Sequence, residues 1–121
     1  MPIHYQSEIK GDYLQVTTSG SIDSVDEMLR YIEEVHGEMA RAGLSKLLVD
    51  ETRCHIHMNL AALEAAADEL HEPTRFVLSK PKLAIVSSAV NYSLHQHLFD
   101  GADKVQVFLE AEAASHWLAQ E

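Results

Sequence analysis

The sequence predicts an α/β domain with a mainly parallel, five-stranded sheet, in the element order ββαβαβαβα. The chain opens with two alternating segments around a Gly-Asp pair, which is typical of a hairpin. The later apolar runs are short, and segments with helical spacing separate them, so right-handed crossovers would make those strands parallel. With 121 residues, 46% hydrophobic and 23% charged, the composition is that of a globular protein. We therefore expect residues 1–121 to form a single domain.

The first two strands are predicted over residues 3–9 and 13–18. In the first, Ile3, Tyr5, Ser7 and Ile9 lie on one side and their polar neighbours on the other, which predicts a half-buried strand. The Gly-Asp pair at residues 11 and 12 supplies the turn, and the second segment is rich in β-branched and aromatic residues.

A long helix is predicted over residues 25–42. Ser24 and Glu27 have capping-box spacing, in which the hydroxyl accepts from the Glu27 amide and the carboxylate reaches back to the Ser24 amide. Gly43 is a natural C-terminal stop. One apolar stripe recurs at helical spacing: Val25, Met28, Leu29, Ile32, Val35 and Met39.

The rest of the chain alternates strands and helices. The continuous apolar run at residues 46–50 indicates a central, parallel strand. A second helix is expected from about Asn59, a fair N-cap, until Pro73 ends or kinks it; the conformation of residues 74–80 is left open. The remaining elements are a strand over residues 83–86, a helix over 91–99, a strand over 104–109 and a helix over 110–119 with Ala114, Trp117 and Leu118 inward.

Charge and cysteine content exclude several functions and indicate a compartment. Nine basic residues against 19 acidic ones give a net charge of −10, which opposes binding to nucleic-acid backbones and anionic membranes. The chain shows no secretory signal and no apolar stretch long enough to span a membrane. A single cysteine, Cys54, forms no internal disulfide, and we expect a small buried hydrophobe in a reducing, cytoplasmic setting.

The segment from Asp50 to Asn59 is the candidate site, because it leaves the carboxyl end of a predicted parallel strand, where open α/β sheets bind ligands. One interpretation is a solvated loop that ends in a helix cap, and the other is a binding or partner-docking loop. Ser87 and Ser88, after the next strand, are either an anion site or a plain strand-end turn. The candidate contact residues are Asp50, Glu51, Thr52, His55, His57, Asn59, Ser87 and Ser88.

No motif in the sequence specifies a reaction. His55 and His57 can chelate one ion only if the segment is extended, and zinc needs three or four ligands, so no metal and no cofactor is expected. Cys54 and His55 are neighbours that point to opposite faces of an extended segment, which argues against a catalytic dyad. The five glycines form no phosphate-binding or nucleophile-elbow pattern.

Three segments carry a resemblance to a known family: VDE at residues 49–51, AIVSS at 84–88 and VQVFLEAEAASHWL at 105–118. Together with the element order, they resemble the SpoIIAA-like branch of the STAS domains, small bacterial proteins related to anti-sigma factor antagonists. The resemblance covers nearly the whole chain. It implies successive βα units that wind in one direction as a superhelix, with the N-terminal strand at an edge.

The phosphorylation switch of that family does not carry over to this sequence. The antagonists have a phosphorylatable serine in a DSSG-type sequence at the start of the second helix, where this chain reads His-Met-Asn-Leu at residues 57–60. No serine or threonine occurs between Arg53 and Pro73. The resemblance therefore implies a non-enzymatic regulatory or protein-interaction module without that serine. In this hypothesis Asp50 and Glu51 supply negative charge at the contact surface.

The histidines complete this hypothesis, and three further possibilities stay open. His55 and His57 would make contact pH-sensitive, and Asn59 would cap the helix. A carrier of a small apolar or amphipathic, lipid-like ligand is the main alternative, and a zinc-dependent or hydrolytic enzyme is the third. An exposed edge strand would also favour a homodimer. The walls proposed for the carrier are Met58, Leu60, Leu63, Val86 and Leu94.

Overall fold

A computed structural model describes residues 3–59, 61, 62, 64, 65, 68, 82–99 and 104–120. Its five-stranded sheet has the order β1-β2-β3-β4-β5. The first pair is antiparallel and the other three pairs are parallel, which confirms the predicted α/β class and the edge position of the first strand. The strands are β1 (His4–Lys10), β2 (Tyr13–Ile22), β3 (Lys46–Ile56), β4 (Lys82–Ser87) and β5 (Val105–Phe108).

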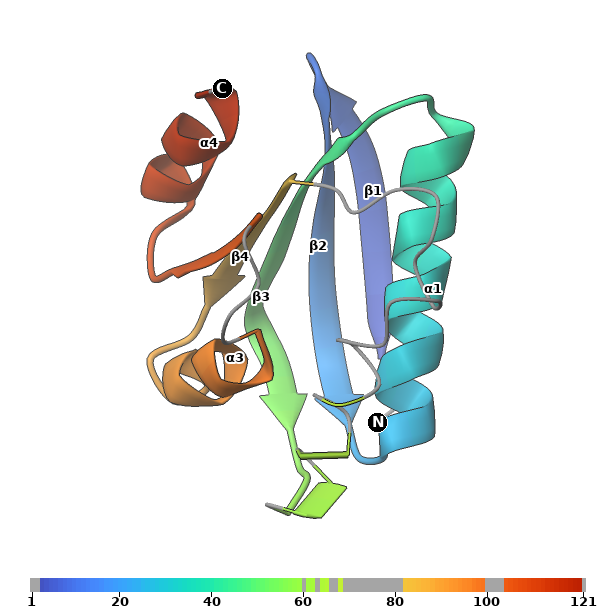
Figure 1. Cartoon of the computed structure of the whole chain (residues 1–121), viewed down its shortest axis with the longest axis vertical. Coiled ribbons are helices and arrows are strands. Elements are labelled where there is room, and N and C mark those ends of the chain that lie inside the picture. Colours follow the sequence, from blue (N-terminus) through green and yellow to red (C-terminus); the bar gives the residue numbers. More distant parts are fainter. Residues whose placement is uncertain are drawn as a thin grey trace.

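Three complete helices flank the sheet: α1 (Val25–Arg41), α3 (Tyr92–Leu98) and α4 (Ala111–Ala119). Figure 1 shows α1 and α4 on opposite sides of the sheet. Of the predicted second helix, residues 61, 62, 64, 65 and 68 are helical, whereas Pro73 and residues 74–80 lie outside the described residues. The Asn59 side-chain oxygen accepts from the Ala62 amide at 2.8 Å, which confirms the predicted N-cap. No described helix is both long enough and apolar enough to cross a membrane.

Both ends of α1 follow from local sequence. Ser24 Oγ accepts from the Glu27 amide at 3.2 Å, as the capping box predicts. The Glu27 carboxylate, however, accepts from the Asp23 amide at 2.9 Å, one residue before the expected Ser24 amide. At the other end, Gly43 has a φ of 72°, a left-handed conformation that glycine adopts without a Cβ clash.

The core has two layers, one on each face of the sheet. The larger layer joins α1 to inward residues of β2, β3 and β4, including Val16, Met39 and Ile85, with Leu94 of α3 against it. The smaller layer packs Ala114 and Leu118 of α4 against Leu48, Ala84 and Val86, with Trp117 at its margin.

Strand β1 is more exposed than its alternation predicts. Ile3 and Tyr5 are half-buried, but Ser7 and Ile9 are exposed, and Ile9 retains 60% of its accessible surface. The predicted half-buried character therefore holds only for the first part of the strand. Side chains of α1 reach Tyr5 and Ser7 through Glu34 and Glu38, at 3.4 and 2.8 Å, but leave Ile9 open at the sheet edge.

A β-bulge interrupts β3 where the candidate site begins. Thr17 pairs with Asp50 and Ser19 pairs with Arg53, so two residues of β3 oppose one residue of β2. An Asp50 carboxylate oxygen accepts from the amide of Thr52 at 3.0 Å and from its hydroxyl at 2.7 Å, which stabilises the bulge. Because one residue is added, the side chains at positions 51 and 54 point to the same face although they are three residues apart.

Candidate functional site

The predicted contact segment is mostly strand. Residues 50–56 belong to β3, and only residues 57–59 lie beyond it, so the expectation of a loop from Asp50 is wrong. Pairing with β2 explains the difference, because that strand continues alongside until Ile22 pairs with Ile56. The segment is therefore held by a sheet ladder.

Four predicted contact residues are exposed and occupy the carboxyl-terminal part of this segment: Thr52, His55, His57 and Asn59. We call these four residues the β3 surface. The rings of its two histidines lie 6.0 Å apart between centroids, and His57 Nδ1 is 3.4 Å from an Asp23 carboxylate oxygen. The His57 amide donates to the Ile22 carbonyl at 2.8 Å, which fixes the end of β3 to the end of β2.

The other four predicted residues lie deeper. Asp50 and Ser88 are half-buried, whereas Glu51 and Ser87 are buried, with 7% and 1% of their surface exposed. Glu51 therefore does not supply negative charge to an exposed surface, and that expectation is wrong. Its position follows from alternation with Leu47 and Val49, both of which also face the core.

Five buried side chains form one hydrogen-bonded chain through the core. The Thr18 and Tyr31 hydroxyls are 2.7 Å apart, and the Tyr31 hydroxyl is 2.7 Å from Glu51 Oε2. Glu51 Oε1 bonds to His95 Nε2 at short range, and His95 Nδ1 is 2.8 Å from Ser87 Oγ. We call these five residues the buried network; it joins β2, α1, β3, α3 and β4.

The direction of three of the four hydrogen bonds in this network follows from acceptors that have no proton to give. His95 Nδ1 is also 3.1 Å from the Asn91 carbonyl, which only accepts, so Nδ1 carries a proton. Ser87 Oγ therefore accepts from His95 and donates to the Ser88 carbonyl at 2.9 Å. On the other side, Tyr31 donates to Glu51 and accepts from the Thr18 hydroxyl. Among the described residues, no buried side-chain nitrogen or oxygen lacks a hydrogen-bond partner.

Ser87, His95 and Glu51 contain the residue types of a hydrolytic triad, but their arrangement does not activate the serine. A general base must accept the serine proton, and here the histidine nitrogen that faces Ser87 is a donor. Ser87 as a whole is also only 1% exposed. The geometry is that of a structural network that ties elements together.

Burial also raises the pKa of the Cys54 thiol and of the Tyr31 phenol, so both groups are less reactive. Desolvation raises the pKa of the Cys54 thiol to about 12, with the negative charges of Glu51 and Glu27 adding to the effect. Burial and then the Glu51 charge raise the pKa of the Tyr31 phenol well above its ordinary value. Cys54 is therefore a protonated thiol at neutral pH, and its predicted role as a buried hydrophobe is confirmed.

The turn between β4 and α3 connects the network to the β3 surface. Strand β4 ends where Ser87 pairs with Glu51, and β3 continues beyond it. There the Asn91 side-chain amide donates to the Cys54 carbonyl at 2.8 Å. The Ser88 hydroxyl accepts from the backbone amide of Asn91 at 3.3 Å. It therefore stabilises the turn, which agrees with the interpretation of Ser87 and Ser88 as a plain strand-end turn.

Sequence reasoning missed Thr18, Tyr31 and His95, which supply the partners of the two buried predicted residues. A carboxylate at an inward position of a central strand needs buried donors, and that requirement was the available signal. The sequence could not say which donors they are, because they come from β2, α1 and α3, and only the assembled fold brings them together.

The remaining alternatives find little support. Val86 packs in the α4 layer while Met58 and Leu94 pack on the other face, so these proposed carrier walls do not line one cavity; Leu60 and Leu63 lie outside the described residues. Within the described part of the chain, no group of three or more histidine, cysteine, aspartate or glutamate side chains could hold a metal.

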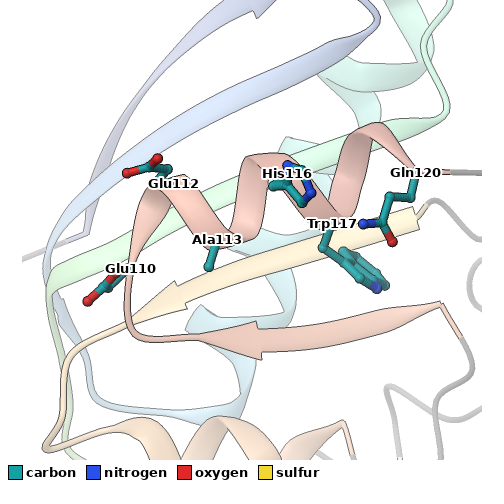
Figure 2. A pocket seen from close by; sticks show the side chains of 6 residues that line it. All are labelled: Glu110, Glu112, Ala113, His116, Trp117 and Gln120. Carbon is teal, nitrogen blue, oxygen red and sulfur yellow. The ribbon is translucent and has the colours of Figure 1, made fainter.

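An open pocket of about 370 Å³ lies along α4, away from the predicted contact residues (Figure 2). Lys82 Nζ sits 4.5 Å from the centre of the Trp117 ring and donates to the Trp117 carbonyl at 2.8 Å, so this ring already has a cationic partner. The pocket is lined by Glu110, Glu112, Ala113, His116, Trp117 and Gln120.

Comparison with solved structures decides the fold type. An anti-sigma factor antagonist from Mycobacterium paratuberculosis superposes with a TM-score of 0.65 and 16% identity, over 98% of this chain and 95% of that one. A DUF3478 family protein from Shewanella loihica PV-4, described as having a SpoIIAA-like fold, gives a TM-score of 0.52 and 22% identity, over 96% and 93% of the two chains. The fold is SpoIIAA-like. No family model and no curated protein sequence matches the chain. The resemblance noted in the sequence is thus confirmed in the SpoIIAA-like fold.

Proposed function

We propose that this protein is a non-enzymatic, cytoplasmic regulatory module of the STAS type, a single domain over residues 1–121 that acts by binding another protein. The observation that carries the proposal is the likeness of the fold to an anti-sigma factor antagonist along nearly the whole chain. In this proposal the βα units wind in one direction as a superhelix, as the resemblance implies. The partner is unidentified, and no nucleic acid is involved, given the net charge of −10.

The proposed contact site is the β3 surface. Its side chains are exposed, and the backbone beneath them is held by the β2 ladder, by the Asn91 amide and by the buried network. A rigid backbone lowers the entropic cost of binding, because little has to be ordered when the partner docks. Asp50 braces the bulge next to Thr52 and so contributes to shape more than to charge.

The proposed regulation differs from that of a phosphorylated antagonist. The second helix is capped by Asn59, and no hydroxyl residue lies between Arg53 and Pro73. Contact at this surface therefore depends on imidazole, hydroxyl and amide groups and involves no phosphoserine. The Ser87 hydroxyl donates its proton to the Ser88 carbonyl and only accepts from His95, which supports a binding role over a hydrolytic one.

Site-specific photocrosslinking in the native host tests the proposal. A photoreactive amino acid at position 55 should capture one protein, and the same amino acid at position 112, exposed on α4, is the matched control. Excess wild-type protein should compete for that adduct, and a Thr52→Ala, His55→Ala, His57→Ala triple variant should compete at least about tenfold less well. If position 55 yields no adduct beyond those of position 112, or if the triple variant competes equally, the proposed contact site is wrong.

A further inference from the structure

Strand β1 forms an edge of the sheet, and no described strand pairs with its outer side. A two-residue turn joins it to β2, in which Gly11 has a φ of 64° and Lys10 pairs directly with Tyr13. In such a hairpin the two residues that flank the turn exchange backbone hydrogen bonds, and every second pair does the same. The amides and carbonyls of Tyr5, Ser7 and Ile9 therefore point outward.

These three outward residues are complementary to a second copy of themselves. In an antiparallel pairing centred on Ser7, Tyr5 lies opposite Ile9 of the second copy, and Ser7 lies opposite Ser7. This is the one register that uses all three outward residues, and it gives six backbone hydrogen bonds between the copies. A shift by one residue would place at the interface amides and carbonyls of β1 that already bond to β2.

The side chains fit the same register. Ile9 is 60% exposed and would cover the ring of the second copy's Tyr5, and an aromatic ring opposite a β-branched residue is a favourable cross-strand pair. On the other face, Gln6 would lie opposite Glu8 and His4 opposite Lys10, so no two like charges face each other directly. Glu8 and Lys10 also cancel within the strand, at 3.3 Å, which makes β1 locally neutral in a chain of net charge −10.

We propose that the protein forms a symmetric homodimer through antiparallel pairing of β1 with β1 of a second copy, in the register that places Ser7 opposite Ser7. Pairing joins the two sheets into one of ten strands. This interface does not include the β3 surface, because β2 lies between β1 and β3 in the sheet.

Sedimentation and light scattering of the full chain between 1 and 500 μM test the interface. The wild type should be a dimer, and Ile9→Glu should weaken the dimer at least about tenfold. Ser7→Pro should do the same, because it removes two inter-copy hydrogen bonds and leaves the bonds to β2. Leu109→Glu is the matched control, since Leu109 is 53% exposed but lies beyond β5. A monomeric wild type, or a dimer that Ile9→Glu and Ser7→Pro leave unchanged, overturns the proposal.

Disulfide trapping tests the register itself. Directly opposed residues of a hydrogen-bonded antiparallel pair have Cα atoms about 5.5 Å apart, within the range for a disulfide, so Ser7→Cys should crosslink under mild oxidation. Glu8→Cys should not, because two such residues would be offset along the strands by about 7 Å. The native Cys54 is buried and does not compete. Equal crosslinking of the two variants, or crosslinking of Glu8→Cys alone, refutes this register.

Discussion

Replacing Tyr31 by phenylalanine removes one oxygen from the middle of the buried network and leaves the ring in place. The hydroxyl donates to Glu51 and accepts from Thr18, in a region where these two partners are only 7% and 0% exposed. A hydrogen bond to a carboxylate contributes about 1.5 to 3 kcal/mol, and a buried hydroxyl left without a partner costs about 1 to 3 kcal/mol. Because the two costs overlap, we expect Tyr31→Phe to lower the free energy of unfolding by about 2 to 4 kcal/mol.

Urea denaturation followed by circular dichroism at pH 7 and 25 °C would measure this loss. Thr18→Val should cost about 1 kcal/mol, since Tyr31 keeps its bond to Glu51. The double variant should cost at least about 1 kcal/mol less than the sum of the single ones, because it leaves no orphaned threonine hydroxyl. Tyr5→Phe is the control, as its hydroxyl meets Glu34 at 3.4 Å in an exposed setting, and it should change little.

Two results would refute the reasoning. One is a loss below about 0.5 kcal/mol for Tyr31→Phe, which would mean that water or local rearrangement replaces the hydroxyl. The other is simple additivity of the Thr18 and Tyr31 substitutions, which would mean that the two side chains do not share one network.

Three further predictions concern single residues. Ser24→Ala should lower the free energy of unfolding by about 1 kcal/mol in urea denaturation, because the Glu27 amide loses its cap; an unchanged midpoint would contradict the capping role. Lys82→Met should shift the fluorescence of Trp117 and lower stability by about 1 kcal/mol, through loss of the cation–π contact and of the bond to the helix-end carbonyl; unaltered emission would count against that contact. The Cys54 pKa is about 12 in the folded chain against 9.0 for an ordinary thiol, so this group's contribution to stability is complete below pH 9 and is lost as the pH rises toward 12. Unfolding measured from pH 8 to 10 should show that fall, and Cys54→Ala should flatten it; equal slopes would refute it.

Most of the fold could be predicted from the sequence because its signals are local. The capping box at Ser24 and the glycine at position 43 mark the two ends of α1 within one residue of the predicted bounds. The apolar runs of β3 and β4 likewise start within one residue of the prediction. Each of these signals depends on residues a few positions apart, and the chain satisfies them without help from distant segments.

The candidate site was less predictable because its geometry depends on contacts between distant segments. The polar residues after Val49 indicated a loop, yet pairing with β2 extends the strand for six residues beyond Asp50. Exposed Thr52 and buried Glu51 are neighbours in a run of four polar residues at positions 50–53. Their difference comes from the bulge and from the donors that Tyr31 and His95 provide, and neither could be read from residues 50–59 alone.

The bulge in β3 also limits which changes of chain length this protein can accept. Most insertions and deletions are tolerated in surface loops, but here the count of residues inside a strand sets the phase of everything that follows. Deleting Thr52 would remove the extra residue and restore regular alternation, with Cys54 and Ile56 still on the core face. A one-residue insertion after Arg53 would instead turn His55 toward the core in place of Cys54 and Ile56. A one-residue deletion at the bulge should therefore be tolerated better than a one-residue insertion in the same strand, because only the deletion keeps the inward side chains in phase.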